Sequence, residues 1–135
     1  MGIEGRELLI SDKKGRYAVD LGERLLEFSV NILKFLMALP RQKELDVIKY
    51  QLSKSATAIG ANYSEAQAGS FREFVQKVRI ALREANDSIY WLKIVEKLKL
   101  GQAEDRDVLL SECKEIASIL GAIVSRSSKK LDEEP

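Results

Sequence analysis

Proline is almost absent from this chain, and no other feature constrains its fold as strongly. The 135 residues contain two prolines, Pro40 and Pro135. A proline inside a helix removes a backbone hydrogen bond, and its ring clashes with the preceding turn. Between Asp20 and Lys130 only Pro40 interrupts a possible helix, and apolar residues recur there at three- and four-residue steps rather than in strand-like alternation. The sequence therefore predicts an all-α fold.

The composition is that of one soluble globular domain. Apolar residues make up 45% of the chain and charged residues 32%. The longest apolar run, residues 32–39, is interrupted by Lys34 and is much shorter than the roughly 20 residues that span a bilayer. The first residues lack the pattern of a secretory signal. We therefore expect a cytoplasmic protein that does not enter a membrane.

The two ends of the chain differ in character from its middle. The motif IEGR at residues 3–6 resembles the recognition site of a processing protease. We interpret residues 1–16 as a flexible segment or as a remnant of a cloning vector, and residues 131–135 (LDEEP) as a solvated acidic tail. The predicted folded domain therefore covers residues 17–130.

Helix start and stop signals divide this domain into four segments. Asp20 is a candidate N-cap of the first helix, which ends before Pro40. Ser70 and Glu73 have the spacing of a capping box for the third helix, and Gly101 is a candidate for the C′ position after its end. Long helices joined by short loops favour an antiparallel up-down-up-down four-helix bundle. The predicted helices cover residues 20–38, 43–67, 71–99 and 104–130.

Each predicted helix carries one apolar stripe that would contribute to a common core. Cys113 falls on such a stripe, and because it is the only cysteine we interpret it as a small core residue. The four stripes are Leu21, Leu25, Phe28, Ile32, Phe35 and Leu39; Leu45, Ile48, Leu52, Ala56, Ile59, Tyr63 and Ala66; Phe71, Phe74, Val78, Ala81, Ala85, Ile89, Leu92 and Val95; and Leu109, Cys113, Ile116, Leu120, Ile123 and Val124.

Two helices carry more apolar surface than one core requires. On the first helix a second stripe lies beside the core stripe, which indicates either a contact with another subunit or a helix that is buried on most sides. A smaller patch on the third helix also lies off its core stripe, and the two together favour a homo-oligomer. The extra residues are Leu26, Val30, Leu33 and Met37 on the first helix and Ile80, Trp91 and Ile94 on the third.

The second helix contains a stretch, QLSKSATAIGANYSEA at residues 51–66, that is poor in strong helix formers. Gly60 alone lowers helix propensity by about 1 kcal/mol relative to alanine. A strip of small side chains lets a neighbouring helix approach closely, so we interpret the stretch as a packing surface. The strip consists of Ser53, Thr57, Gly60, Ala61, Ser64 and Ala68.

Several kinds of chemistry are missing from the sequence. There is no histidine, which removes the commonest general base and metal ligand, and Gly-rich phosphate loops are absent. Glu65, Glu84 and Asp87 could form a carboxylate cluster or, alternatively, polar ties between helices. We favour a polar network of Asn62, Glu65, Glu84 and Tyr90, to which Lys54 could contribute. We expect neither an enzyme nor a cofactor or metal.

The third helix carries a row of basic residues on one face. Its members are spaced by four and three residues, which keeps them within an arc of about 100° over nearly 40 Å. Such a row can follow a nucleic-acid backbone, but it can also be a solvated face or meet acidic residues of another subunit. The row is Arg72, Gln76, Arg79, Arg83, Asn86, Tyr90, Lys93 and Lys97.

Long segments of the chain resemble a known family. QLSKSATAIGANYSEAQAGS, followed by EFVQKVRIALREANDSIYWL, closely resembles the two signature segments of the four-helix-bundle proteins encoded in bacterial 23S rRNA intervening sequences. LLEFSVNILKFLMALP resembles the first helix of that family, so the similarity covers about residues 17–130. Arginine is more usual in the family at the position of Lys54. The matching signature residues are Lys54, Ser55, Asn62, Tyr63, Glu65, Glu84, Tyr90 and Trp91.

That family is similar in turn to the accessory proteins of diversity-generating retroelements, which form pentameric rings and bind nucleic acid and a reverse transcriptase. The resemblance implies a homopentameric, ring-shaped bundle with a positively charged surface that binds RNA or DNA. This chain departs from that pattern because its net charge is only +1. Any binding of nucleic acid must then depend on local clusters of charge.

We expect a non-enzymatic, oligomeric bundle that binds nucleic acid, in particular RNA. The competing hypothesis is a protein-interaction scaffold, such as an accessory subunit of a reverse transcriptase, that binds through the extra apolar stripes. The expected phosphate contacts are Arg72, Arg79, Arg83, Lys93 and Lys97, with secondary contacts from Arg41, Lys43, Lys49 and Lys54.

Overall fold

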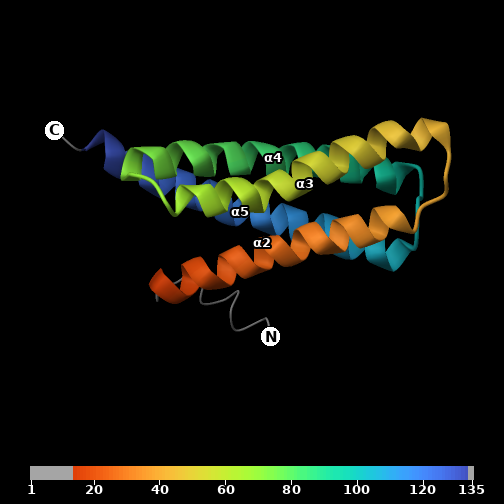
Figure 1. Ribbon diagram of the computed structural model, residues 1–135, viewed down its shortest axis with the longest axis horizontal. Coiled ribbons are helices and arrows are strands. Elements are labelled where there is room, and N and C mark those ends of the chain that lie inside the picture. The colour runs from red at the N-terminus through yellow and green to blue at the C-terminus, as the bar shows by residue number, and fades with distance from the viewer. Residues whose placement is uncertain (1–13, 134–135) are drawn as a thin grey trace.

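The computed structural model describes residues 14–133, and it describes side chains from residue 21 onward. This part of the chain is all-α and contains no strand, which confirms the predicted fold class (Figure 1). One 3₁₀ turn, η1, precedes the second long helix. The elements are α2 (Lys14–Met37), η1 (Lys43–Leu45), α3 (Asp46–Ala66), α4 (Phe71–Lys97) and α5 (Ala103–Asp132).

The ends of the first and last helices differ from the prediction. Helix α2 begins at Lys14, so the prediction of Asp20 as its N-cap is wrong. No proline lies between these residues, and the helix therefore continues upstream past a good capping residue. Of the predicted flexible segment, residues 1–13 lie outside the described residues. Helix α5 runs to Asp132, so the predicted tail 131–135 starts inside the helix, and its last two residues are outside the described part.

Helix α4 begins at the predicted capping box. The Ser70 hydroxyl accepts a hydrogen bond from the Glu73 amide at 3.2 Å, and the Glu73 carboxylate accepts one from the Ser70 amide at 2.7 Å. Two of the four amides that a helix start leaves without partners are thereby satisfied. This part of the prediction is confirmed.

Helix α4 ends two residues earlier than the predicted C′ position implies. The Lys99 amide donates to the Glu96 carbonyl at 3.0 Å and the Leu100 amide to the Val95 carbonyl at 3.1 Å. This bond pair is a Schellman motif with Lys99, at φ +55°, in the left-handed C′ position. The prediction of Gly101 at C′ is therefore wrong. Gly101 also has a positive φ of +69°, but it belongs to the loop that follows.

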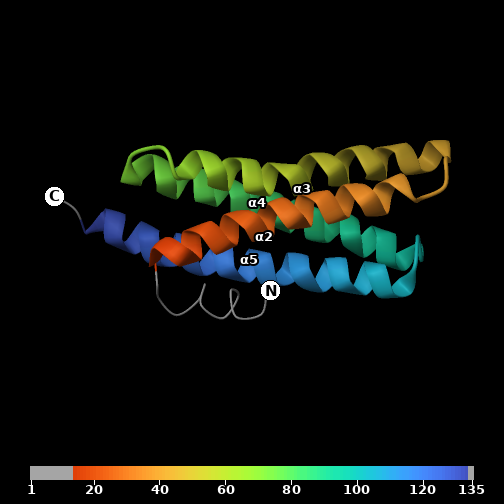
Figure 2. The same cartoon turned by 60° about the horizontal axis from the view of Figure 1, so that its bottom comes forward.

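The four long helices lie side by side along the long axis of the molecule (Figures 1 and 2). Helix α2 packs against α3 and α5, and α4 packs against the same two helices from the other side. The loops after α2 and α4 lie at one end, and the loop after α3 lies at the other (Figure 1). Each helix therefore has two neighbours and turns one face to the common interior.

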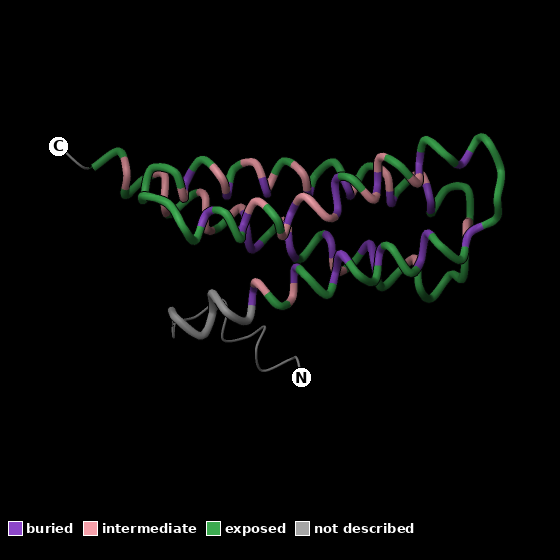
Figure 3. Tube along the Cα trace, in the orientation of Figure 1, coloured by how far each residue is buried: buried purple, intermediate pink, exposed green. Residues whose placement is uncertain are grey.

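The core follows the predicted apolar stripes. Every predicted core residue of the α2 stripe and of the segment Leu45–Ala66 is buried, and the buried positions recur along each helix on its inner side (Figure 3). On α5, Leu109, Cys113, Ile116 and Leu120 are buried as well. The α4 stripe is only partly confirmed, because Phe71 is exposed while Val75, outside the predicted stripe, is buried.

Gly60 lies at a close contact between α2 and α3. A Cβ atom added to Gly60 would lie 3.3 Å from the Leu25 Cβ, and the Ser29 hydroxyl donates to the Ala56 carbonyl at 3.3 Å. The packing interpretation of the poor helix is confirmed at this position. It does not extend along the whole predicted strip, because Ala61, Ser64 and Ala68 are exposed.

An ion-pair cluster joins α2 to α5. The Arg24 guanidinium donates to both carboxylate oxygens of Glu112, at 2.6 and 2.9 Å, and also to Glu115. Burial alone would lower the pKa of Arg24, but the hydrogen bonds and negative charges of Glu112 and Glu115 outweigh it and hold the pKa above its usual value. Arg24 thus stays charged between the two helices.

The second apolar stripe of α2 lies on the surface of the chain. Leu26, Val30, Leu33 and Met37 are 59, 41, 38 and 78% exposed, so burial within the single chain does not explain them. Of the two interpretations of this stripe, the helix buried on most sides is therefore wrong. On α4, by contrast, Trp91 and Ile94 are half-buried against the core.

The charges along α5 are unevenly distributed. Glu104 and Asp105 lie in its first turn, and Lys129 and Lys130 lie in its last turn. Both pairs complement the partial charges of the helix termini. Between residues 14 and 133, no helix has the combination of length and hydropathy needed to cross a bilayer.

Candidate nucleic-acid interface

All eight positions of the predicted basic row lie on the exposed side of α4. From Arg72 to Lys97 the row extends about 38 Å, at about 1.5 Å per residue. The sequence predicted this alignment from spacing alone, and the helix runs without interruption from Phe71 to Lys97. Five cations therefore face solvent along one line.

The five cations of the row have no acidic partner at ion-pair distance among the described residues, although Arg83 acts electrostatically on Glu84. Arg79 donates a hydrogen bond to the hydroxyl of Ser128 on α5, which places the row beside the last turns of that helix. Of the nearby acids, Glu73 is held by the helix cap. The charge of the row is thus available to an outside partner.

The four secondary cations do not extend the row. Lys49 donates to the Pro40 carbonyl at 2.9 Å and so stabilises the loop between α2 and α3. Lys54 lies on α3, with its ammonium 5.8 Å from the centre of the exposed Tyr50 ring. Arg41 and Lys43 are exposed near that same loop. Lys54, on α3, is close enough to α4 to act on Glu84, as Arg83 of the row does.

The four residues of the predicted polar network do not form one network in the structure. Asn62 donates to the Ala58 carbonyl of its own helix at 2.8 Å. Glu65 instead pairs with Lys77 at 2.7 Å, away from Glu84. The exposed Tyr90 ring contacts Trp91 edge-to-face, with 5.3 Å between the ring centres. Each of these side chains thus has its own local partner.

The predicted contact between Lys54 and the polar network is an electrostatic interaction with Glu84. Partial burial raises the pKa of Glu84, and the negative charge of Asp87 raises it further, while Lys54 and Arg83 act in the opposite direction. The Lys54 contribution that we expected is therefore electrostatic. The possible carboxylate cluster contains Glu84 and Asp87 but not Glu65.

Besides the exposed ion pair of Glu65 and Lys77, a buried polar contact joins α3 and α4, and the sequence analysis missed it. The hydroxyls of Ser55 and Ser88 lie 2.7 Å apart, and both residues are buried. The Ser88 hydroxyl donates to the Glu84 carbonyl of its own helix at 2.9 Å, which leaves the Ser55 hydroxyl as the donor between the two serines; Ser55 Oγ also lies 3.4 Å from the Leu52 carbonyl.

The sequence did contain a signal for this contact. Ser55 follows the core residue Leu52 by three positions, and Ser88 follows the core residue Ala85 by three, a spacing that keeps each serine near the core side of its helix.

Cys113 is the core residue that the sequence predicts. It is fully buried, and its thiol donates to the Ala85 carbonyl at 3.4 Å. Burial, reinforced by the negative charge of Glu112, raises the pKa of the Cys113 thiol to about 12. The thiol is thus protonated at neutral pH. Within residues 14–133, no group of three acidic, cysteine or histidine side chains could hold a metal ion.

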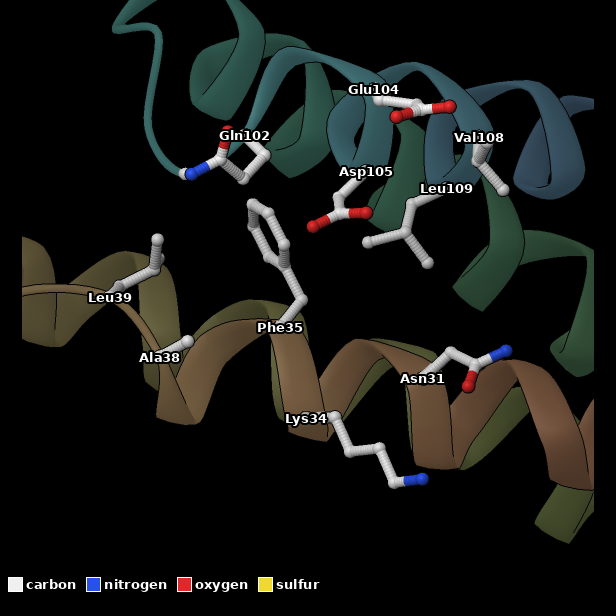
Figure 4. Close-up of a pocket in the computed structure, with 11 residues that line it drawn as sticks. Asn31, Lys34, Phe35, Ala38, Leu39, Gln102, Glu104, Asp105, Val108 and Leu109 are labelled. Atoms are coloured by element: carbon white, nitrogen blue, oxygen red, sulfur yellow. The ribbon is translucent and has the colours of Figure 1, made fainter.

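A groove of about 520 Å³ lies between α2 and α5, away from the α4 row. Phe35 of α2 points toward α5, where Asp105 and Leu109 face it, whereas Lys34 points away (Figure 4). The lining combines apolar residues of both helices with Glu104 and Asp105 of the first turn of α5. None of the residues predicted to bind nucleic acid or to form the polar network lines this groove.

The profile of the 23S rRNA-intervening sequence protein family matches residues 20–122, which include α3, α4 and most of α2 and α5. The chain belongs to this family. The stated resemblance is therefore confirmed for the family, and the matched region contains the whole α4 row.

A crystal structure of a family relative has the same fold. It is that of a protein of unknown function from the S23 ribosomal protein family of Bacteroides thetaiotaomicron. The two chains are 30% identical and superpose with a TM-score of 0.73, over 80% of this chain and 97% of the other. No functionally curated protein matches the sequence significantly.

Proposed function

We propose that this protein is a non-enzymatic, nucleic-acid-binding member of its family, and that the α4 row contacts the phosphate backbone of RNA. The observation that carries the proposal is the position of Arg72, Arg79, Arg83, Lys93 and Lys97. They share one exposed line on a continuous helix and form no ion pairs with described acids. In this proposal the four helices form an antiparallel up-down-up-down bundle that presents the row on its outside.

The physical consequence of backbone binding is a strong dependence on salt. Each phosphate neutralised by a cation releases condensed counterions, so the logarithm of the association constant falls with the logarithm of salt concentration by about 0.7 to 0.9 per contact. Arginine adds bidentate hydrogen bonds to phosphate oxygens. Because the net charge of the chain is only +1, long-range attraction contributes little and the local row must supply the affinity.

The test is the affinity of the intact protein for a labelled structured RNA over a range of salt concentrations. We expect retention at low salt that weakens steeply as salt rises. Arg83→Glu should weaken binding by about tenfold or more at low salt, because it replaces one attraction by one repulsion. Lys34→Glu makes the same charge change at an exposed position on α2 and should leave the affinity nearly unchanged. Wild-type protein without salt-sensitive binding, or equal effects of the two variants, would refute the proposal.

The exposed stripe of α2 favours self-association. Leu26, Val30, Leu33 and Met37 form a continuous apolar line along one side of the helix. A second copy of the chain that covers this line removes it from water, and repetition of the contact around a closed symmetry axis gives a ring. The resemblance to pentameric accessory proteins favours five subunits.

Sedimentation of a stripe variant tests the assembly. Leu26→Glu combined with Met37→Glu should shift the protein from the oligomer to the folded monomer, since both side chains are already exposed in the single chain. Leu98→Glu changes an exposed apolar residue outside the stripe and should leave the oligomer intact. A stripe variant that sediments as the wild type does would contradict the assignment of this surface.

The same stripe supports the second candidate function, a scaffold or accessory subunit that binds another protein such as a reverse transcriptase. Purification of the tagged protein from its native host separates the two functions. Co-purifying RNA supports the RNA-binding function, and a stoichiometric protein partner that is lost with the α2 stripe variant supports the scaffold.

A further inference from the structure

The contact between Arg79 and Ser128 brings a second set of cations to the α4 row. Ser128 lies in the last turns of α5, and Cys113, farther back on that helix, contacts the Ala85 carbonyl of α4. Residue numbers therefore fall along α5 as they rise along α4. The α5 residues beside the row can be located from these two contacts and from the helical period.

From Ser128, steps of three and four residues along α5 follow the side that borders the α4 row. They reach Ser125, Gly121, Ser118 and then Lys114. Lys114 is exposed, and at the other end Lys129 follows Ser128 directly and is exposed as well. Because Cys113 contacts Ala85, Lys114 lies about level with Arg83, and the long Arg79 side chain reaches along the helices to Ser128. The α5 helix thus places Lys114 beside Arg83 and Lys129 toward the N-terminal end of the row, near Arg72.

We call the surface formed by Arg72, Arg79, Arg83, Lys114 and Lys129 the two-helix basic face. It extends about 22 Å along α5, from Lys114 to Lys129, at about 1.5 Å per residue. Acidic residues bound it: Asp132 lies one turn beyond Ser128, and Asp87 lies one turn beyond Arg83 at the other end. Lys93 and Lys97 are beyond that boundary.

The stretch of α5 between Lys114 and Lys129, beside the α4 row, forms a low strip. Ser118, Gly121 and Ser125 are small, and a Cβ atom added to Gly121 would meet no other atom within 4 Å. A backbone that follows the strip can therefore approach the helices while the α4 cations on one side, and Lys114 and Lys129 at its ends, reach its phosphates. Over about 22 Å, one strand of a duplex presents about six phosphates, a number close to the five cations of the face.

We propose that the two-helix basic face binds the sugar-phosphate backbone of an RNA duplex. This inference rests on the proposed function and specifies the residues of the RNA contact. Lys114 and Lys129 belong to the contact, and Lys93 and Lys97 lie outside it. Tyr90 is the only aromatic residue among the eight positions of the α4 row. Proteins that hold single strands stack successive bases on several aromatic rings, so this face fits a paired backbone better than an unpaired strand.

The experiment measures the salt dependence of binding to a labelled RNA duplex and to a single strand of equal length. Wild type should prefer the duplex, with a log-log slope of about −4 for five contacts. Lys114→Gln and Lys129→Gln should each reduce the magnitude of the slope by about one. Lys97→Gln, on the same α4 row but outside the face, and Lys34→Gln, on α2, should leave the slope unchanged.

A bulky residue in the low strip gives an independent test of the two-helix basic face without a change of charge. Gly121→Gln should weaken duplex binding several-fold, because its side chain fills the low strip. Gly121→Ala should bind as wild type does, since one methyl group occupies little of that strip. Circular dichroism and sedimentation of both variants establish that they fold and assemble normally, as the open space around Gly121 leads us to expect.

The outcomes separate this inference from the proposed function. If Arg83→Glu reduces RNA binding but Lys114→Gln and Lys129→Gln leave the slope unchanged, the two-helix face is wrong and the α4 row stands. Equal or tighter binding of the single strand would overturn the duplex assignment. If wild type binds neither RNA in a salt-sensitive manner, the proposed function and this inference both fail.

Discussion

Gly101→Val should destabilise the protein more than any other single change considered for the loops. The backbone of Gly101 has φ +69°, where a β-branched residue is strongly strained, and a Cβ atom there would lie 2.6 Å from the Phe35 ring. Left-handed strain costs about 1–2 kcal/mol and displacement of a buried ring about 1–3 kcal/mol. We expect a loss of about 3 kcal/mol, measured by urea unfolding, and a melting temperature lower by about 10 °C.

The matched control lies two residues away in the same turn. Lys99 also has a positive φ, +55°, but it carries a side chain. Lys99→Gly should relieve the left-handed strain and raise the free energy of unfolding by up to about 1 kcal/mol. If Gly101→Val proves as stable as wild type, the close contact between this loop and Phe35 is not present in solution.

Gly60→Leu should produce the second large effect, at the contact between α2 and α3. The Leu25 backbone carbonyl carbon and oxygen lie 3.6 and 3.7 Å from the position of an added Cβ, so they leave no room for a leucine side chain. Overpacking of a close helix contact costs about 3 kcal/mol or more, against a gain of about 1 kcal/mol in helix propensity. We expect a marked fall in the urea midpoint, accompanied by loss of assembly.

Two alanine variants separate the effect of the close helix contact on stability from the effect of helix propensity. Gly121 is also inside a helix but has open space around it, so Gly121→Ala should raise stability by about 1 kcal/mol. Gly60→Ala gains the same propensity but must displace Leu25 by a few tenths of an ångström, and its net effect should be smaller. A soluble, normally assembled Gly60→Leu protein would show that the helices do not meet closely at this residue.

The apolar periodicity was sufficient to predict the core. Residues such as Leu25, Ile59 and Leu120 recur at helical spacing and are completely buried, because a helix that exposes its apolar face loses the hydrophobic free energy of burial. The spacing of Ser70 and Glu73 was equally sufficient to locate the start of α4, since a capping box is a local interaction.

Contacts between helices could not be predicted in the same way. Which polar side chains meet across α3 and α4 depends on the rotation and register of both helices, which the spacing along either one does not specify. Asn62 and Glu65 therefore have other partners, and the buried pair Ser55 and Ser88 was overlooked. The left-handed conformation of Lys99 was missed for a related reason, because the tertiary structure overrides the preference for glycine at C′.

The candidate site likewise has one part that the sequence could predict and another that required the structure. The α4 row could be predicted because its members occupy one helix and share one period. Lys114 and Lys129 could not be assigned to it from the sequence, since the packing of α5 against α4 is what brings them alongside the row. Exposure of the α2 stripe also required the structure, because the sequence alone left open which side of that helix its neighbours cover.

The unequal ends of α5 affect how the molecule meets a charged partner. Its first turn carries Glu104 and Asp105, whereas in its last turn Lys129 and Lys130 are followed by Asp132 and Glu133, so the first end is acidic and the last end is close to neutral. A polyanion is therefore repelled from the first turn of α5 and attracted to the cations along the side of α4. The rate of productive encounter, and not only the strength of the final complex, would then decrease as salt is added.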